Sequence, residues 1–440
     1  MILFFFVVKE IFLFFTVSTF PITTTILLFY LSIFTERARA HANERAKIII
    51  IERNETMKII FDREAVSNAV APLMCAIGGK STVAATEGIL MEGREDGTCV
   101  MTTFDLKKGI RIVVDAQVEE VGAAVINAQK FIQTLRVMEG QFVTLTVSDN
   151  MQACIHSGKS NHKMTAINAA DYPEIPRLVT EYGFSISQSV LKSLISKVMY
   201  AMAVNDDVRP VLNGCFFKVS EDSLLAVSCD SYKMAKCSVR TDIQNENNSK
   251  EALNFSFIIP NKTITELYKL LKDDERETAR IYMSRKNIVF NIGGMIFFSS
   301  LIEGQYIDYD CILGNKHRIF VNVNRDMLIS ALERAALVTE EKIVRSVRSH
   351  VKLAFEDGVL KISAISTLGS TYDELDVDQQ GGNLVIAFNN RFLIDSLRAS
   401  EAETVKISMT SEHTNIHIEP AEQSDDSKEL FFLLPVRMKD

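Results

Sequence analysis

Three stretches of the chain repeat one pattern: IIFDREAVSNAV (59–70), FSISQSVLKSLI (184–195) and VNVNRDMLISAL (321–332). Each begins with a short apolar run typical of a β-strand and continues with apolar residues at helical spacing. Asp62, Ser187 and Asn324 stand between the two parts, where a side-chain oxygen can accept hydrogen bonds from the first helical turn. The sequence therefore predicts three copies of one unit.

A second helix is predicted in each unit, at INAQKFIQTL (126–135), IPNKTITELY (259–268) and FNNRFLIDSL (388–397). Between the two helices lie stretches of period-two alternation, at 99–116, 215–230 and 351–366, with Asp-Gly or Glu-Asp turn signals. This pattern indicates an α+β fold in which two helices pack on antiparallel sheets in each unit. We expect domains at 57–176, 182–313 and 317–440.

The N-terminal segment differs from the rest of the chain. Residues 1–34 carry only Lys9 and Glu10 as formal charges among long apolar runs, which is the composition of a stretch that can enter a membrane. One interpretation is a membrane anchor. The other, which we favour, is that the protein begins at Met57 and that residues 1–56 are not part of the fold.

Cysteine usage and charge limit the function classes. The seven cysteines are an odd number without a Cys-x-x-Cys pair, so neither a disulfide framework nor a structural zinc site is expected. The chain is acidic overall, with a net charge of −8. The windows over which the six helices are predicted nevertheless contain twelve basic and only five acidic residues; these windows are 63–76, 127–138, 187–202, 262–272, 324–337 and 389–399. Helices that line one surface would therefore make it positive and able to hold a phosphate backbone without reading bases.

The sequence motifs that could indicate a catalytic or metal site do not fit one. GGKST (78–82) resembles the end of a phosphate-binding loop, but Met74 stands where the first glycine belongs and a predicted helix precedes the run instead of a strand. His413 and His417 are four residues apart in a segment with β patterning, which would not place them on one helical face. We therefore expect no catalytic residues, no cofactor and no metal.

Further segments resemble a known family, the β sliding clamps of bacterial DNA polymerase III. The resemblance covers 57–440 and rests on segments in the family's order: MKIIFDREAV (57–66), RPVLNG (209–214), AVSCDSYKMA (226–235), LIEGQYIDYDCIL (301–313), ERAALVTEEKIVRSV (333–347) and LLPVRM (433–438). It implies a cytoplasmic, non-catalytic processivity factor. Two chains would form a head-to-tail ring around duplex DNA, with helices lining the hole. The implied partners are the polymerase catalytic subunit, the clamp loader and other proteins with a clamp-binding motif. A membrane-anchored DNA-binding scaffold remains the alternative, and a phosphate-binding enzyme the least favoured one.

The resemblance also implies which residues contact partners. The family's peptide cleft lies between its second and third domains, and the matching residues are Leu212, Cys229, Ser231, Tyr232, Met234, Ile307, Cys311, Ile312, Phe432, Leu434, Pro435 and Val436. The family usually has Thr-Asp-Gly-His-Arg-Leu at 229–234, and Pro and Arg at 307 and 311, so the peptide preference of this chain is expected to differ.

Two further sets of residues follow from the resemblance. The dimer interface would join Lys159, His162 and Met164 on an edge strand of the first domain to Leu337 and Val338 of the other protomer. His162 stands where the family often has an aromatic residue, and a histidine there could make ring closure sensitive to pH. The residues expected to face DNA are Lys80, Lys130, Lys192, Arg209 and Lys262.

Overall fold

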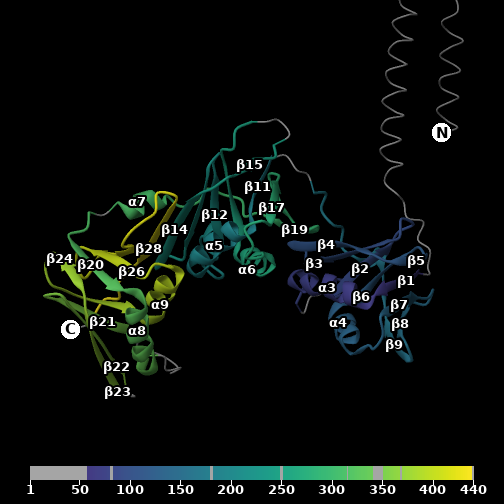
Figure 1. Ribbon diagram of the computed structural model, residues 1–440, viewed down its shortest axis with the longest axis horizontal. Coiled ribbons are helices and arrows are strands. Elements are labelled where there is room, and N and C mark those ends of the chain that lie inside the picture. Colours follow the sequence, from purple (N-terminus) through teal and green to yellow (C-terminus); the bar gives the residue numbers. More distant parts are fainter. Residues whose placement is uncertain are drawn as a thin grey trace, which may run out of the picture. The chain divides into compact units, whose positions relative to one another are not determined.

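One order of elements occurs three times along the chain: a strand, a helix, five strands, a second helix and three strands. The computed structural model describes residues 57–79, 83–178, 182–247, 251–314, 316–339, 350–366 and 369–438. Within these ranges the predicted α+β repeat is confirmed, with two helices and antiparallel sheets in each copy (Figure 1). Residues 1–56 and Lys80 lie outside the described residues, so the expectations about them stay predictions.

The elements of the three copies correspond one to one. The first copy consists of β1 (Met57–Asp62), α3 (Arg63–Leu73), β2 (Gly88–Gly93), β3 (Thr98–Phe104), β4 (Lys108–Asp115), β5 (Gln117–Glu120), β6 (Ala123–Asn127), α4 (Ala128–Val137), β7 (Phe142–Val147), β8 (Gln152–Ser157) and β9 (Ser160–Thr165). The second consists of β11 (Tyr182–Ser187), α5 (Gln188–Val198), β12 (Gly214–Val219), β13 (Ser223–Cys229), β14 (Lys233–Arg240), β15 (Gln244–Asn245), β16 (Phe255–Pro260), α6 (Asn261–Leu270), β17 (Thr278–Met283), β18 (Asn287–Ile292) and β19 (Met295–Ser300). The third consists of β20 (Ile319–Asn324), α8 (Arg325–Thr339), β21 (His350–Glu356), β22 (Val359–Ser366), β23 (Gly369–Asp376), β24 (Asp378–Gln380), β25 (Leu384–Asn389), α9 (Asn390–Ala399), β26 (Thr404–Met409), β27 (Ile416–Pro420) and β28 (Ser427–Leu433).

Short elements connect these parts. The strand β10 (Ile167–Asn168) and the helix α7 (Tyr309–Leu313) follow the first and second copies. The 3-10 turns are η1 (Met74–Ala76), η2 (Ala84–Glu87), η3 (Ala169–Asp171), η4 (Met199–Ala201) and η5 (Pro210–Asn213). Gly78 and Gly79 of the GGKST run follow α3 and a 3-10 turn, and residues 80–82 lie outside the described residues.

The predicted helix caps are confirmed at two of three positions. The Asp62 carboxylate accepts hydrogen bonds from the backbone N–H groups of Glu64 and Ala65, both at 3.0 Å. The Asn324 amide oxygen likewise accepts from Met327 N at 3.0 Å. The prediction is wrong for Ser187, whose hydroxyl contacts the Ser189 hydroxyl at 3.0 Å and makes no cap bond.

Two continuous sheets cross the boundaries between the copies. In a ten-stranded sheet, β4 of the first copy pairs antiparallel with β19 of the second, from Lys108 opposite Ser299 to Arg111 opposite Ile296. In a nine-stranded sheet, β14 of the second copy pairs with β28 of the third over seven residue pairs. Both seams therefore join equivalent strands, the fourth strand of one copy and the last strand of the next.

The same two strands lie at open edges where the repeat ends. The last strand of the first copy, β9, is an edge of a five-stranded sheet, and the fourth strand of the third copy, β23, is an edge of a four-stranded sheet. The edges of β16 and β25 are partly covered, because Ile302 N donates to Ile258 O and Val436 N donates to Ala387 O. Among the described residues, no backbone hydrogen bond reaches the outer edge of β9 or β23.

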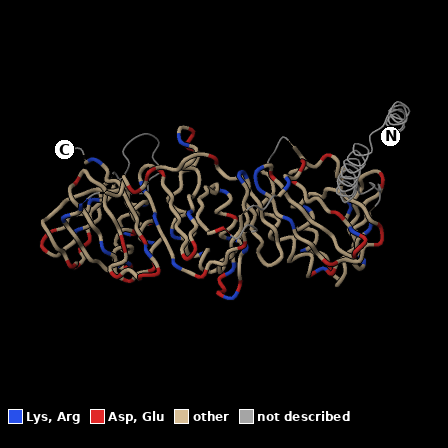
Figure 2. Tube along the Cα trace, turned by 90° about the horizontal axis from the view of Figure 1, so that it is seen from above, with Lys and Arg blue, Asp and Glu red and all other residues tan. Residues whose placement is uncertain are grey.

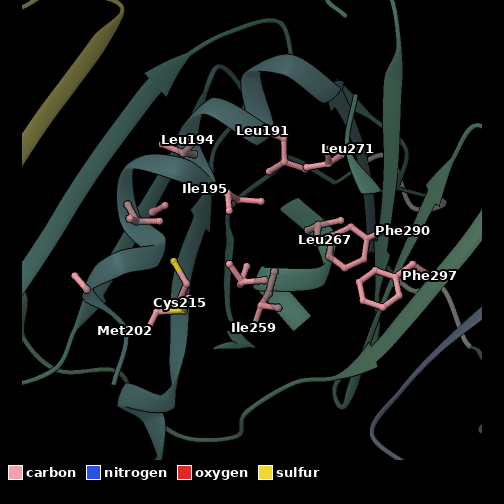
Figure 3. Packing of buried hydrophobic residues seen from close by; sticks show 14 of the residues in the cluster. Leu191, Leu194, Ile195, Met202, Cys215, Ile259, Leu267, Leu271, Phe290 and Phe297 are labelled. Atoms are coloured by element: carbon pink, nitrogen blue, oxygen red, sulfur yellow. The ribbon is translucent and has the colours of Figure 1, made fainter. Parts of the chain in front are cut away.

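Each pair of helices packs together over its sheets: α3 with α4, α5 with α6, and α8 with α9 (Figure 1). Lys and Arg are interspersed with Asp and Glu along the trace (Figure 2). In the second copy, Figure 3 shows Leu191 and Ile195 of α5 and Leu267 of α6 pointing toward one interior that Phe290 and Phe297 also enter. The helices thus bury their apolar stripes, and their other faces are left for charged residues. Within the described ranges, no helix is both long and apolar enough to cross a membrane.

Candidate partner cleft and cationic helices

An apolar cluster lies where the second and third copies meet. It contains Leu212 of η5, Cys229 at the end of β13, Met234 of β14 and Phe432 of β28, each at most 5% exposed, and Ile307 packs against it. The cross-strand pair Met234–Phe432 places side chains of both copies opposite each other in the sheet. Five residues of the predicted cleft are therefore brought together. Four of them are buried, and we call these four the buried wall, whereas Ile307 is half-buried.

Other residues predicted to line the cleft lie beside this wall and are more exposed. The Tyr232 ring is 48% exposed and its centre lies 6.4 Å from that of Phe392 on α9. The chain after β28 runs past this place, since Leu434 N donates to Tyr232 O at 2.9 Å and Val436 N bonds to β25. Pro435 between them is half-buried. Phe392 was missed by sequence reasoning, although its apolar position in FNNRFLIDSL was the available signal.

The turn between β13 and β14 contains one departure from the pattern that the resemblance implied. Ser231 stands where the family usually has Gly, and its φ of +81° is the left-handed conformation that favours Gly. The Arg209 guanidinium donates a hydrogen bond to the Ser231 hydroxyl and pairs with the Asp206 carboxylate at 3.2 Å. Hydrogen bonds from the Arg209 N–H group hold the pKa of Asp206 below its ordinary value. Arg209 is therefore bound to the cleft turn and neutralised there.

The residues on α7 lie outside the buried wall. Cys311 and Ile312 are exposed, and the Asp308 carboxylate caps the helix by accepting from Cys311 N at 3.1 Å. Lys236 of β14 holds α7 through an ion pair with Asp310 at 2.5 Å. The structure thus places these two predicted cleft residues on a short helix at the surface.

A groove of about 1200 Å³ lies along the segment Leu301–Asp310 and shares Ile307 with the cleft region. Its walls include the rings of Phe216, Phe255 and Tyr309. Part of its lining belongs to the segment LIEGQYIDYDCIL (301–313), but the sequence did not indicate a groove, because the rest of the lining comes from strands and turns far apart in the chain.

Most helical cations already have carboxylate partners. Seven of the twelve basic residues counted in the sequence form ion pairs: Lys197, Lys269, Lys272, Arg325, Arg334, Arg391 and Arg398. Lys272 also lies beyond the end of α6 at Leu270, so counting it as helical was wrong. The remaining five have no carboxylate within 4.0 Å in the part of the chain that the structure describes: Arg63, Lys130, Arg136, Lys192 and Lys262.

These five cations belong to α3, α4, α5 and α6, whereas every Lys or Arg on α8 and α9 is paired. Lys130 and Lys262 are exposed, and the Lys192 ammonium lies 5.6 Å from the centre of the Tyr268 ring. Three of the five predicted DNA-facing residues are thus without a carboxylate partner. Among the described helical residues, the cations without a carboxylate partner therefore belong to the first and second copies, a distribution that the sequence did not show.

The residues predicted at the dimer interface lie on the edge strand β9, in the turn before it, and on α8, which packs against the edge strand β23. His162 and Met164 are on β9, whereas Lys159 is in the turn before it and not on the strand as predicted. On the third copy, Leu337 near the end of α8 is 81% exposed and Val338 is half-buried. The sequence analysis missed two exposed apolar residues, Ile365 on β22 and Tyr372 on β23. Alternation along a strand shows that successive side chains lie on opposite faces, but it does not show which face is exposed to solvent.

Comparison with known proteins identifies related chains. Three family models match: the N-terminal domain of the DNA polymerase III beta subunit at residues 57–176, its central domain at 185–308 and its C-terminal domain at 311–434. A beta sliding clamp of Staphylococcus epidermidis is 25% identical over 391 residues, which are 87% of this chain and 99% of the relative. One of Staphylococcus aureus is 26% identical over 372 residues, 82% of this chain and 94% of the relative.

Solved structures have the same fold. The sliding clamp of Pseudomonas aeruginosa bound to griselimycin is 26% identical, with a TM-score of 0.76, covering 87% of this chain and 100% of that one. The DNA polymerase sliding clamp of Bacillus subtilis is 23% identical, with a TM-score of 0.79 and the same coverage.

Proposed function

Because the chain belongs to the DNA polymerase III beta subunit family, the sliding clamps, we propose that it is the processivity factor of a replicative DNA polymerase. In this role it is a non-catalytic subunit that encircles duplex DNA and tethers the polymerase to it. We further propose the domain boundaries 57–176, 182–313 and 317–440, and a cytoplasmic location. The observation that carries the proposal is the repeated seam, whose two strands recur as open edges at the ends of the repeat.

A ring closes if the strand pairing of the two seams also forms between chains. Within the chain, the fourth strand of one copy pairs with the last strand of the next, twice. The unused fourth strand is β23 and the unused last strand is β9. A second chain can offer its β9 to β23 of the first and its β23 to β9, which is a head-to-tail contact that closes after two chains. Pairing would also remove two exposed edges that otherwise favour aggregation.

Side chains on β9 and near the end of α8, which packs against β23, support this contact. His162 and Met164 on β9, with Lys159 in the turn before it, would meet the exposed Leu337 and the half-buried Val338 of the partner protomer. Burying apolar surface such as that of Leu337 stabilises an interface by about 25 cal/mol per Å².

Contact with DNA is proposed for the helices of the first and second copies. Lys130, Lys192 and Lys262 have no carboxylate within ion-pair distance among the described residues, so each can contact a phosphate without first breaking a salt bridge. Binding by such contacts is independent of sequence and weakens as salt concentration rises. Lys80 keeps its proposed role, and Arg209 would have to leave Asp206 and Ser231 to take part.

Partners are proposed to bind through the cleft. The buried wall of Leu212, Met234 and Phe432 suits apolar anchors of a short peptide, and Tyr232 and Leu434 lie exposed beside it. Such peptides would come from the polymerase catalytic subunit, the clamp loader and other proteins with a clamp-binding motif. Cys229, Ser231 and Ile307 would shift the preferred motif from the one usual in the family, while Cys311 and Ile312 would contact only peptides that extend to α7.

Topological retention on DNA tests the proposal. The full chain is loaded onto primed circular DNA with the clamp loader and ATP, and retention at moderate salt is measured before and after the circle is cut. We expect retention on the circle and loss from the linear product. Equal loss from both, or equal salt-sensitive retention on both, would contradict a closed ring.

Two matched variants sharpen the experiment. Leu337→Asp places a charge at the proposed interface and should convert the dimer to a monomer and abolish retention. Met327→Asp, at a 55% exposed position near the start of the same helix, should leave both unchanged. If the two variants behave alike, the assignment of the interface to the end of α8 is wrong.

A further inference from the structure

The edge of a sheet lines the groove that runs along the segment Leu301–Asp310. Ser256 and Ile258 of β16 are part of the lining, and β16 is the outermost strand of the nine-stranded sheet. The two sides of the groove are the segment that follows β19 and the turn between β17 and β18, at Arg285 and Lys286. The proposed function gives this groove of about 1200 Å³ no role.

The hydrogen bonds of β16 indicate which backbone groups face the groove. Ile302 N donates to Ile258 O at 3.0 Å, so the C=O group of Ile258 points away from β12. Alternate residues of an antiparallel strand point their N–H and C=O groups to the same side, so those of Ser256 also point away from β12. Pro260 fits this pattern, because it has no N–H group to donate at the open edge. Among the described residues, the backbone N–H and C=O groups of Ser256 have no hydrogen-bond partner.

Aromatic rings lie on both sides of this edge and line the groove. The Phe216 side chain is on the same face of the sheet as Ser256, and its ring centre lies 6.0 Å from that of Tyr309. On the opposite face, the ring centre of Phe255 lies 6.0 Å from that of Tyr182, which is 41% exposed. A strand added beside Ser256 would therefore meet aromatic surface on both of its faces. Strands that are buried on both faces have continuous apolar runs.

The charges around the groove favour a peptide over a nucleic acid. Arg285 and Lys286 are exposed on one side, and Glu303 and Asp308 are exposed on the other. Phosphate backbones bind where positive charge is concentrated, whereas here two carboxylates accompany the two cations. A peptide that joins a sheet edge needs no net positive charge, because its backbone binds through hydrogen bonds.

We propose that β16 binds an extended, continuously apolar segment of a protein that is also anchored in the partner cleft. The segment would join the sheet as a further strand, with its backbone bonded to that of Ser256. The groove meets the cleft at Ile307, which lines the groove and packs against the apolar cluster that contains the buried wall. One partner chain can therefore occupy both places, and the second contact forms within the complex and raises the overall affinity. This inference rests on the proposed cleft and adds a second contact to it.

Hydrogen exchange in the full chain tests the added strand. The Ser256 N–H group should exchange rapidly in the free chain, because it has no hydrogen-bond partner among the described residues. It should exchange about tenfold more slowly, or slower still, when the polymerase catalytic subunit or the clamp loader is bound, since a strand hydrogen bond then protects it. A short peptide that carries only the clamp-binding motif should leave this exchange unchanged, because it fills the cleft alone.

Two proline variants test the contribution to affinity. Ser256→Pro removes the N–H group and should fold, because proline is accepted where the N–H group faces an open edge. It should weaken binding of the polymerase subunit about tenfold, since a hydrogen bond and the contacts beside it are lost, and should leave binding of the short peptide unchanged. Val385→Pro is the matched control on β25, two positions before Ala387, which accepts from Val436 N at the same edge position of the third copy. It should bind both probes as the unaltered chain does.

The outcomes separate this inference from the proposed function. If the short peptide does not bind the unaltered chain, the cleft assignment fails and the inference fails with it. If the peptide binds but neither partner slows exchange at Ser256, or if the two proline variants weaken binding of the subunit equally, the cleft stands and the added strand is refuted. Slow exchange at Ser256 in the free chain would mean that a second copy or residues 1–56 already occupy the edge, which also overturns the proposal. If Ser256→Pro does not fold, exchange in the unaltered chain decides alone.

Discussion

A buried ion pair at the seam between the second and third copies gives the sharpest prediction about stability. The Lys197 ammonium on α5 lies 2.7 Å from the Glu429 carboxylate on β28, and the two residues are 9% and 7% exposed. The Ser400 hydroxyl donates to the other carboxylate oxygen at 3.0 Å. The substitution Lys197→Met removes the cation and leaves the carboxylate buried with that hydroxyl alone.

The expected cost follows from burial. Leaving one partner of a buried pair uncompensated typically costs about 3–5 kcal/mol, and replacing both partners by apolar residues is often neutral or stabilising. We therefore expect Lys197→Met to lower the free energy of unfolding by about 3–5 kcal/mol. The double variant Lys197→Met/Glu429→Leu should recover most of this loss. Lys361 and Glu356 provide the control, because they also lie 2.7 Å apart but are about 40% exposed. Lys361→Met should cost less than about 1 kcal/mol.

The same substitution is expected to affect the cleft. Glu429 lies opposite Cys237 in the seam, three residues before Phe432 of the buried wall. Hydrogen exchange of β14 and β28 in the full chain measures the local effect, and titration with a clamp-binding peptide measures the functional one. We expect faster exchange along this seam and weaker peptide binding, with the seam between β4 and β19 unchanged. Equal stability losses for Lys197→Met and Lys361→Met, or no recovery in the double variant, would refute the reasoning.

The pair also predicts a dependence on pH. Burial acts most strongly on Lys197 and would lower its pKa, but the hydrogen bond and charge of Glu429, with the charge of Glu401, together outweigh burial. The pKa of Lys197 therefore lies above its ordinary value of 10.5. A raised pKa in the folded state means that the stabilisation is complete below the unfolded value and is lost as pH rises through the folded value. Urea unfolding should show the contribution intact at neutral pH and lost above pH 10.5, and only in chains that carry Lys197.

Three smaller predictions concern caps, backbone strain and thiols. Asp62→Ala should destabilise the first copy by about 1 kcal/mol in thermal unfolding, whereas Ser187→Ala, which removes no cap bond, should cost less than half as much. Because Ser231 has a positive φ, Ser231→Gly should be more stable than Ser231→Ala by about 1 kcal/mol, and equal stability would contradict the strain. In maleimide labelling, exposed Cys311 should react first, whereas Cys237, whose pKa burial raises to about 12, should react only after unfolding; early labelling of Cys237 would show that this part of the sheet opens.

Local chemistry decided how far the fold could be predicted from the sequence. Apolar spacing and the cap residues Asp62 and Asn324 indicated the three copies, because helices and strands bury stripes with different periods. The same reasoning failed at Ser187, where a neighbouring hydroxyl at Ser189 offered a competing partner. A cap residue shows where a helix can begin. Whether its side chain makes the cap hydrogen bond depends on neighbouring polar groups, which the spacing of apolar residues does not reveal.

The candidate sites were harder to predict, because they depend on contacts between distant residues. The sequence indicated correctly that basic residues outnumber acidic ones on the helices, although it counted Lys272, which lies beyond α6. It did not show that Arg334 is paired with Asp373 on a strand 39 residues away. Only coordinates show that α8 is neutralised while Lys130 is not. The ring of Phe392 next to Tyr232 became visible for the same reason.

The seam between copies is a joint made by backbone hydrogen bonds, and it does not depend on whether the two copies belong to one polypeptide. A closed ring made with this joint requires a fixed number of copies. It does not require that these copies come from a particular number of chains. Two chains of three copies would satisfy it, and so would three chains of two. The polypeptide connections decide which joint can come apart. When strands pair within one chain, a broken joint reforms because the two copies stay connected. When strands pair between chains, a broken joint separates fully. The opening of such a ring is thereby confined to the contact between β9 and β23, and side chains at that contact alone can tune how often it opens.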